Sequence, residues 1–200
     1  MNSQHRFPWP LRFCTGRELC NHHPLAAFIW SGVLALIAAS ALSGQELREP
    51  SRDATERGFS LMNKESLGSL KLEMSAKDIT SLLGKPEKTG KDIEWEALGE
   101  FVQQWSWPES GIVAEMVSGK KGGNKKVLMF TAKAPWDKAT SKGIRIGSTE
   151  AEVRAAYGAY EDKEMSKPGS SFIAGSVYGG LQFTFTKGKV TAVFFGASAE

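Results

Sequence analysis

The stretch LKLEMSAKDITSLLG, from Leu70 to Gly84, has a chemical counterpart 74 residues later (144 less 70), IRIGSTEAEVRAAYG, from Ile144 to Gly158. The two stretches align without a gap. Only the final glycine is identical, but the apolar, hydroxyl and acidic positions correspond. A pattern that recurs at a fixed spacing predicts two copies of one structural unit.

Each copy has the sequence signature of a capped helix. Ser75 is followed three residues later by Asp78, and Thr149 by Glu152. In such a capping box the hydroxyl oxygen accepts a free backbone N–H of the first helical turn, and the carboxylate accepts the N–H of the cap residue. The pattern therefore predicts a short strand, a cap and a helix in each copy. Two unrelated short helices with good caps are the alternative.

Both predicted helices have one apolar stripe, since apolar residues recur at i, i+3 and i+4. The stripes consist of Ile79, Leu82 and Leu83 in the first copy and of Val153, Ala156 and Tyr157 in the second. Gly84 and Gly158 follow at the positions where a helix commonly ends in a left-handed residue.

Alternating or β-branched segments after each helix predict antiparallel strands. They are 92–97, 101–107, 112–117 and 127–131 in the first copy, and 172–178, 181–186 and 189–195 in the second. The predicted fold class is α+β: two tandem repeats, residues 67–131 and 144–200, joined by a connector over 132–143, with the helices on one face of the sheets. An apolar helix is expected to precede them.

The amino-terminal region predicts export. From Leu25 to Leu42 the chain carries no charge, and arginines precede this segment. Residues 1–43 therefore form either a cleaved signal peptide or a retained membrane anchor. Residues 44–66 are predicted to be a polar tether. The cysteines and histidines of the chain all precede the apolar segment Leu25–Leu42, and their spacing matches no closed zinc site.

The charge of the remaining chain does not favour nucleic-acid binding. The whole chain carries 25 basic and 22 acidic residues. Three arginines and one glutamate precede the apolar segment, which leaves 22 basic residues (25 less 3) and 21 acidic ones (22 less 1). A net charge of +1 does not predict nucleic-acid binding.

The chain resembles a superfamily of exported modules through three segments, Lys71–Pro86, Gly143–Gly158 and the hairpin at Tyr178–Val190. It is similar to the tandem modules of the β-lactamase-inhibitor-protein type and to the small lipoprotein subunit of the outer-membrane barrel-assembly machine. The resemblance implies a non-enzymatic module whose helices back an antiparallel sheet, with the open sheet face binding another protein. Two features depart from these families: the body has no cysteine for a disulfide, and no lipidated cysteine follows the apolar segment.

The residue types after position 23 limit the possible chemistry. That part of the chain has neither histidine nor cysteine, which argues against His-dependent nucleophiles and His- or Cys-ligated metals. We therefore expect no catalytic residues, no metal and no cofactor. A carboxylate-dependent glycan hydrolase using Glu94, Glu96 or Glu100 is a less favoured alternative.

Two groups of residues are candidate contact sites. Aromatic side chains in or beside the first strands of the copies are candidates for binding a protein partner: Trp95, Phe101, Trp105, Trp107, Phe172 and Tyr178. The alternative is that most of these aromatic side chains belong to the hydrophobic core. Lysines at a predicted hairpin tip are candidates for docking on an anionic surface: Lys120, Lys121, Lys125 and Lys126.

Together these features predict an exported, non-catalytic binding module of the cell envelope or secreted space. Its expected partner is an unidentified protein held on the sheet face. A membrane-anchored component of envelope assembly, held by the segment Leu25–Leu42, is the principal alternative.

Overall fold

The computed structural model describes residues 52–197. The predicted signal peptide or anchor and the first part of the predicted tether lie outside the described residues. Within them, no helix is long and apolar enough to cross a membrane.

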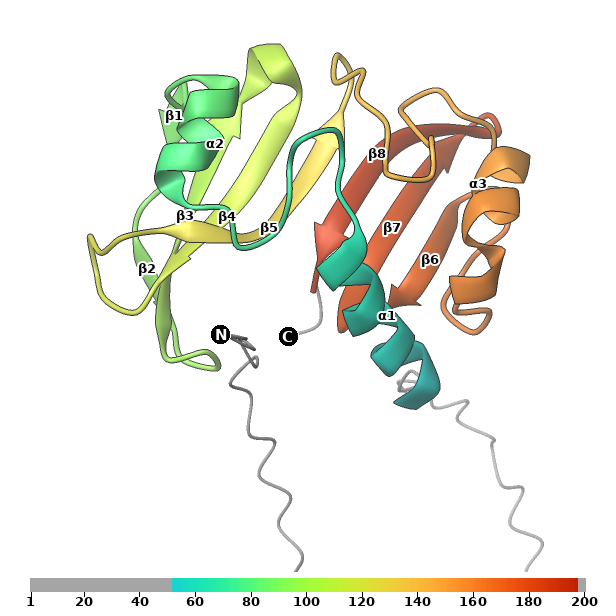
Figure 1. The fold of residues 1–200 in the computed structure, drawn as a ribbon, viewed down its shortest axis with the longest axis horizontal. Helices are drawn as coiled ribbons and strands as arrows, with labels where there is room; N and C mark the ends of the chain where they lie inside the picture. The colour runs from blue at the N-terminus through green and yellow to red at the C-terminus, as the bar shows by residue number, and fades with distance from the viewer. Residues whose placement is uncertain (1–51, 198–200) are drawn as a thin grey trace, which may run out of the picture. The chain divides into compact units, whose positions relative to one another are not determined.

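All the described strands belong to one antiparallel sheet (Figure 1). They are β1 (Lys88–Thr89), β2 (Ile93–Trp95), β3 (Glu100–Trp107), β4 (Ile112–Ser118), β5 (Lys126–Lys133), β6 (Ser171–Ser176), β7 (Gly179–Thr186) and β8 (Lys189–Gly196). Their order is β1-β3-β4-β5-β8-β7-β6, and β2 also pairs with β3. The sheet is thus continuous across the two predicted repeats, because β5 pairs with β8.

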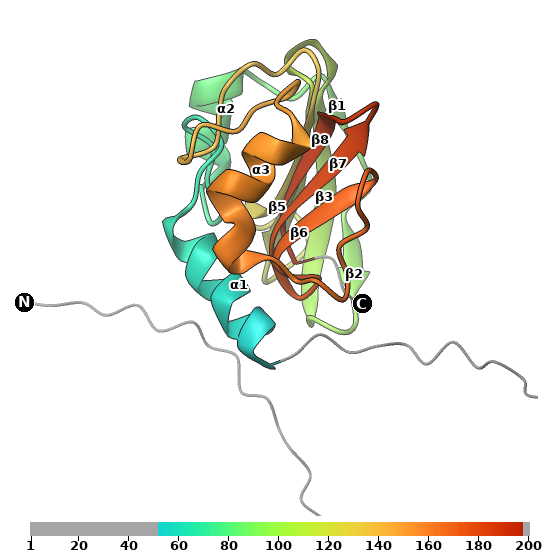
Figure 2. The ribbon, with the colours of Figure 1, turned by 90° about the vertical axis from the view of Figure 1, so that its right-hand side faces the viewer.

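Three α-helices lie on one side of this sheet, as Figure 2 shows. They are α1 (Arg52–Lys64), α2 (Ala76–Leu83) and α3 (Glu150–Tyr157). Two short 3-10 helices, η1 (Pro108–Ser110) and η2 (Gly158–Tyr160), complete the described elements. The structure is therefore of the predicted α+β class.

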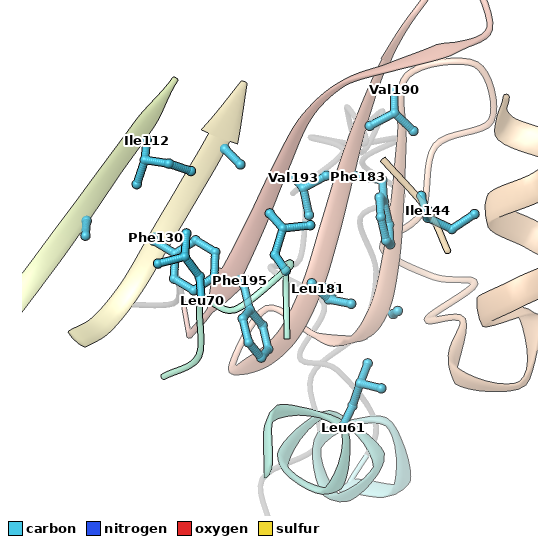
Figure 3. Close-up of a cluster of buried hydrophobic side chains, with 14 of the residues drawn as sticks. Leu61, Leu70, Ile112, Phe130, Ile144, Leu181, Phe183, Val190, Val193 and Phe195 are labelled. Atoms are coloured by element: carbon cyan, nitrogen blue, oxygen red, sulfur yellow. The ribbon is translucent and has the colours of Figure 1, made fainter. Parts of the chain in front are cut away.

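The hydrophobic core lies between the sheet and the helices. Side chains on one face of neighbouring strands line up in rows that cross the whole sheet. One row is Phe172, Phe183, Val193, Ala132, Ile112 and Trp107, and each of these is almost fully buried. A second buried row includes Leu181, Phe195, Phe130 and Ala114 (Figure 3). The alternation seen in the sequence thus corresponds to one continuous apolar layer.

The helix signals in the sequence are largely confirmed. Both capping boxes form: Ser75 accepts from the Asp78 N–H, and Thr149 from the Glu152 N–H. Gly84 ends α2 with a φ of 81°. Gly158 differs from the prediction, because its φ of −55° continues the chain into η2.

The predicted short strands before the helices do not form. In their place, the cap residues make isolated bridges to the last strand of each repeat, Ser75 to Lys126 of β5 and Thr149 to Lys189 of β8. The apolar stripe is also narrower than predicted, since Leu82 is 41% exposed.

Two segments of the structure share several local features, and we call residues 70–133 the first unit and residues 144–196 the second unit. In the first unit the amides of Glu73 and Ala76 donate to the carbonyls of Val127 and Lys125. In the second unit Gly147 and Glu150 donate in the same way to Val190 and Gly188.

Each unit also has a β-bulge at a corresponding place. The register shifts between Glu115 and Met116 in the first unit and between Thr184 and Phe185 in the second. In both cases one residue of the last strand of the unit is left without a partner in the ladder. It is Leu128 of β5 in the first unit and Thr191 of β8 in the second. A bulge adds local twist at a defined position and is a specific feature of a sheet, not a defect.

Helix α1 corrects the prediction that residues 44–66 are a polar tether. Its 13 residues begin at Arg52 and pack against β6 and β7. Leu61 points from α1 toward the sheet beside Leu181 (Figure 3). The contact is close because Gly58 lies against the backbone of Gly175 and Gly179.

A buried hydrogen-bond network holds the carboxyl-terminal end of α1. The Glu65 side chain is only 3% exposed. It accepts from the Tyr157 hydroxyl at 2.7 Å and from the backbone amides of Ser66 and Ser141 at 2.9 and 2.8 Å. Burial raises the pKa of the Tyr157 hydroxyl far above its ordinary value, and the nearby Glu65 adds to this effect. Tyr157 therefore stays a donor at all physiological pH values.

The approach of α1 predicts the effect of adding one methyl group at Gly58. A Cβ there would lie 2.9 Å from the carbonyl carbon of Gly179 and closer still to its oxygen. We expect Gly58→Ala to lower the free energy of unfolding by about 1 to 3 kcal/mol, as overpacking typically does. Urea denaturation followed by circular dichroism measures it.

Gly158→Ala is the matched control. A Cβ at Gly158 meets nothing within 4 Å, and its φ is already helical. This substitution is expected to leave stability unchanged or to raise it by about 0.5 kcal/mol. Equal effects of the two substitutions would contradict the close packing of α1.

Candidate binding face of the sheet

The face of the sheet opposite the helices is the principal candidate site. Residues that pair across β3, β4, β5, β8, β7 and β6 form one row on it. In order across the sheet these are Ser106, Val113, Thr131, Phe194, Gln182 and Ile173. All but the buried Ile173 are partly exposed. We call this side of the sheet the open face.

The open face mixes apolar and polar side chains. Its apolar members with exposed surface include Val113, Met129 and Phe194, and also Ile93 and Trp95 of β2. Beside them, the Gln104 amide donates to the Glu115 carboxylate at 2.8 Å across the strands. A set of apolar side chains between paired polar ones is the usual composition of a protein interface, in which the polar rim surrounds a drier centre.

The six aromatic residues predicted to contact a partner are not gathered on this face. Trp107 and Phe172 are buried in the core, at 1% and 0% exposure, which conflicts with a role in direct contact. Phe101 and Trp105 pair with Ser118 and Ala114, so their side chains lie on the helix side.

The other two predicted aromatics lie in different places. Trp95 pairs with Glu100, next to Val102 on the open face, and is partly exposed. Tyr178 is 37% exposed in the turn between β6 and β7. The six candidate aromatic residues therefore do not share one surface.

The four lysines of the predicted hairpin tip also separate into two kinds. Lys120 and Lys121 are exposed. Lys125 is only 8% exposed, and its ammonium lies 2.7 Å from Asp92. Lys126 pairs with Glu73 at 2.6 Å. The prediction that Lys125 docks on a surface is wrong, and only two of the four ammonium groups remain without an acidic partner.

The carboxylates of the alternative hydrolase do not converge. Glu94 pairs with Phe101 and Glu100 pairs with Trp95. Because adjacent positions on a strand point to opposite faces, the Glu94 and Glu100 side chains lie on opposite sides of the sheet. Glu96 is exposed just beyond β2. An acid and base that flank one glycosidic bond must face a common substrate, and Glu94 and Glu100 do not.

The described residues hold no group of three or more His, Cys, Asp or Glu side chains that could bind a metal. Comparison of the chain with protein-family models, with curated proteins and with solved structures finds no match. The functional argument therefore depends on the geometry of the molecule itself.

Val113 and Phe194 are the open-face residues that the sequence analysis missed. The segment KVTAVFF ends in two adjacent phenylalanines, of which Phe195 is buried and Phe194 is partly exposed. The sequence does contain a pattern that would have identified Phe194. Val193 and Phe195 alternate with it, so they lie on one face of the strand and Phe194 lies on the other.

The ion pair of Asp92 and Lys125 predicts a dependence of stability on pH. The Lys125 ammonium, and then the Gly122 amide, hold the pKa of Asp92 below its ordinary value of 3.8. A lowered folded pKa stabilises the fold above pH 3.8, and this contribution is lost as the pH falls through the folded value. We expect Asp92→Asn to lower the urea midpoint at pH 6, with the difference from wild type shrinking toward pH 3.

Asp137→Asn is the control for this prediction. The Asp137–Lys138 pair is exposed, at 75% and 60% of the side-chain surface, so solvent screens it. Its loss should change the midpoint little at either pH. An Asp92→Asn effect as small as that of Asp137→Asn would mean that the buried pair does not stabilise the loop.

Proposed function

We propose that this chain is an exported, non-catalytic binding module that engages a protein partner through the open face of its sheet. The observation that carries the proposal is the one-sided architecture: all three described helices cover one face, and the other presents partly exposed Val113, Met129 and Phe194 between polar side chains. Exposed apolar side chains that lie together within a polar rim often mark interaction sites.

We also infer that the first and second units are two copies of one ancestral unit. The capping boxes, the hydrogen bonds from the cap segment to the last strand and the position of the bulge support this inference. Two units joined edge to edge make a wider face than either alone. A standard protein interface buries roughly 800 Å² on each partner, and joining two three-stranded units brings the face closer to that size.

The chemistry of the chain supports a role in binding. Residues after position 23 include no histidine or cysteine, and the acidic residues Glu94 and Glu100 are on opposite faces. The apolar segment Leu25–Leu42 supports export, either as a secreted protein or as one that stays anchored in the membrane.

Substitution on the open face tests the proposal. We expect Phe194→Lys to reduce recovery of the partner from envelope extract at least about tenfold, because a charge is introduced at the centre of the interface. The bait is the full chain, cross-linked before capture and analysed by mass spectrometry. Circular dichroism reports whether the variant keeps its fold.

Leu82→Lys is the matched control, since it also replaces an exposed apolar side chain, on α2 at the opposite side of the sheet. It should leave recovery unchanged. A partner lost equally from both variants, or kept by both, would contradict binding through the open face. If the captured protein is a second copy of this chain, sedimentation should show a dimer that Phe194→Lys dissociates.

A further inference from the structure

The two units differ most in their insertions. In the second unit a tight turn at Lys187–Gly188 joins β7 to β8. In the first unit residues 119–125 join β4 to β5. The 16 residues 84–99 between α2 and β3 carry the strands β1 and β2, whereas the 13 residues 158–170 between α3 and β6 of the second unit carry η2. The second unit completes its three strands and bulge without these additions. These two segments are therefore candidates for a function that the second unit does not share.

The two insertions are fastened to each other. Asp92, between β1 and β2, accepts from the Lys125 ammonium at 2.7 Å and from the Gly122 amide at 2.7 Å. Lys125 also donates to the Ser118 hydroxyl at 3.1 Å. Because the Lys125 and Asp92 side chains are only 6% and 11% exposed, water screens this pair weakly. The loop is thus held in one position against the added strands.

A groove of about 520 Å³ lies between these insertions and the amino-terminal end of α2. Its lining includes Trp105, Gln103, Asp92, Lys121, Asn124 and Lys125. The groove is open to solvent, and it combines an aromatic surface with a few placed polar groups, as small-ligand sites do.

Trp105 is the aromatic surface of this groove. The residue at the corresponding position of the second unit is buried, as the following comparison shows. Counted from the bulge, Trp105 corresponds to Phe172, since their pairing partners Ala114 and Phe183 each lie two residues before the shifted position. Phe172 is fully buried, with the Arg154 guanidinium 5.4 Å from its ring centre. Trp105 remains partly exposed.

The orientation of Trp105 is fixed before any ligand arrives. Its indole N–H donates to the Gln103 side-chain oxygen at 2.9 Å, and the Gln103 amide donates to the Gly90 carbonyl at 3.0 Å. Its ring also packs edge-on against Trp107, with the centroids 6.1 Å apart. A ligand that stacks on this indole therefore does not have to order it, which lowers the cost of binding.

The polar groups of the walls select the kind of ligand. The backbone amides of Ala76, Gly122 and Gly123 already donate to groups within the protein. A peptide laid in the groove would find few main-chain donors there. The side chains of Lys121 and Asn124 are exposed instead, and they provide donors for hydroxyl and carboxylate oxygens.

The charge of the groove favours an anion. Asp92 is the one carboxylate among the lining residues, and Lys125 balances it. Lys121 adds a second positive charge that makes no direct ion pair among the described residues, although it lies close enough to Asp92 to help lower the pKa of that carboxyl, and Lys120 is exposed beside it. We propose that this groove binds an acidic saccharide, with a sugar ring stacked on Trp105 and a carboxylate near Lys121.

Calorimetric titration of the full chain with a tetramer of galacturonic acid tests the proposal, with the methyl ester of the same tetramer as the uncharged probe. We expect the acid to bind and the ester to bind several-fold more weakly. Lys121→Gln should weaken the acid by about two- to fivefold and leave the ester unaffected, as expected for loss of one exposed charge. Trp105→Leu should weaken both probes about tenfold.

Trp95→Leu is the matched control, because it removes a partly exposed indole from the open face. It and Phe194→Lys should leave saccharide binding unchanged, so this proposal can fail or succeed independently of binding through the open face. If Trp105→Leu does not fold, the exposed Lys121→Gln variant still decides the outcome.

Three results would overturn the proposal. The first is the absence of heat with the acidic tetramer. The second is equal binding of acid and ester, because the cationic rim would then play no part. The third is tighter binding of a tetraglutamate peptide that is lost in the same variants, which would make the groove a peptide site.

Discussion

The pairing of β5 with β8 is the contact on which the rest of the structure depends. Four residue pairs, from Phe130 with Phe195 to Lys133 with Ala192, join two three-stranded ladders into one sheet. Because the last strands of the two units pair in antiparallel fashion, the strand order reads the same outward from the centre in both directions. An arrangement of this kind places α2 and α3 on the same side, where one apolar layer serves both.

The one-sided architecture follows from this contact. Phe130 and Phe195 meet with their rings at 87° and their centroids 5.5 Å apart, at the middle of the core. Thr131 and Phe194, one position away on each strand, point to the opposite face. The same ladder that completes the core therefore also completes the open face. Helix α1 adds to the core layer on the second unit, and the strands β1 and β2 extend the sheet beyond the first.

The two units differ in the length of one loop and in the burial of one aromatic residue. The second unit closes its ladder with a two-residue turn, and its Phe172 is buried. The first unit has a longer loop held by a buried ion pair, and its corresponding Trp105 is partly exposed. Burying charged groups is costly unless they are well paired, and Asp92 and Lys125 are paired with each other and with Gly122 and Ser118.

Local patterns in the sequence predicted most of the strands, because alternation is a property of each segment alone. LQFTFT and FVQQWSW form β7 and β3 nearly as expected. Alternation shows which residues share a face but not which face the helices cover. For that reason Trp105 and Trp107 were assigned to a binding surface although they lie on the helix side.

Helix α1 was missed for a different physical reason. RDATERGFSLMNK is mostly polar and contains a glycine in its middle, which local propensity counts against a helix. That glycine allows α1 to approach the backbone of β6 and β7, and this contact is visible only in three dimensions. The ion pair of Asp92 and Lys125 was missed likewise, since 33 residues separate the partners.

Solution NMR of the full chain gives the most direct test of the continuous sheet. The account predicts cross-strand nuclear Overhauser contacts between Thr131 and Phe194 and between Ala132 and Val193, together with slow exchange of the amides in β5 and β8. Contacts within β3-β4-β5 and within β6-β7-β8, but none between β5 and β8, would contradict it, because the two units would then not share a core or a face.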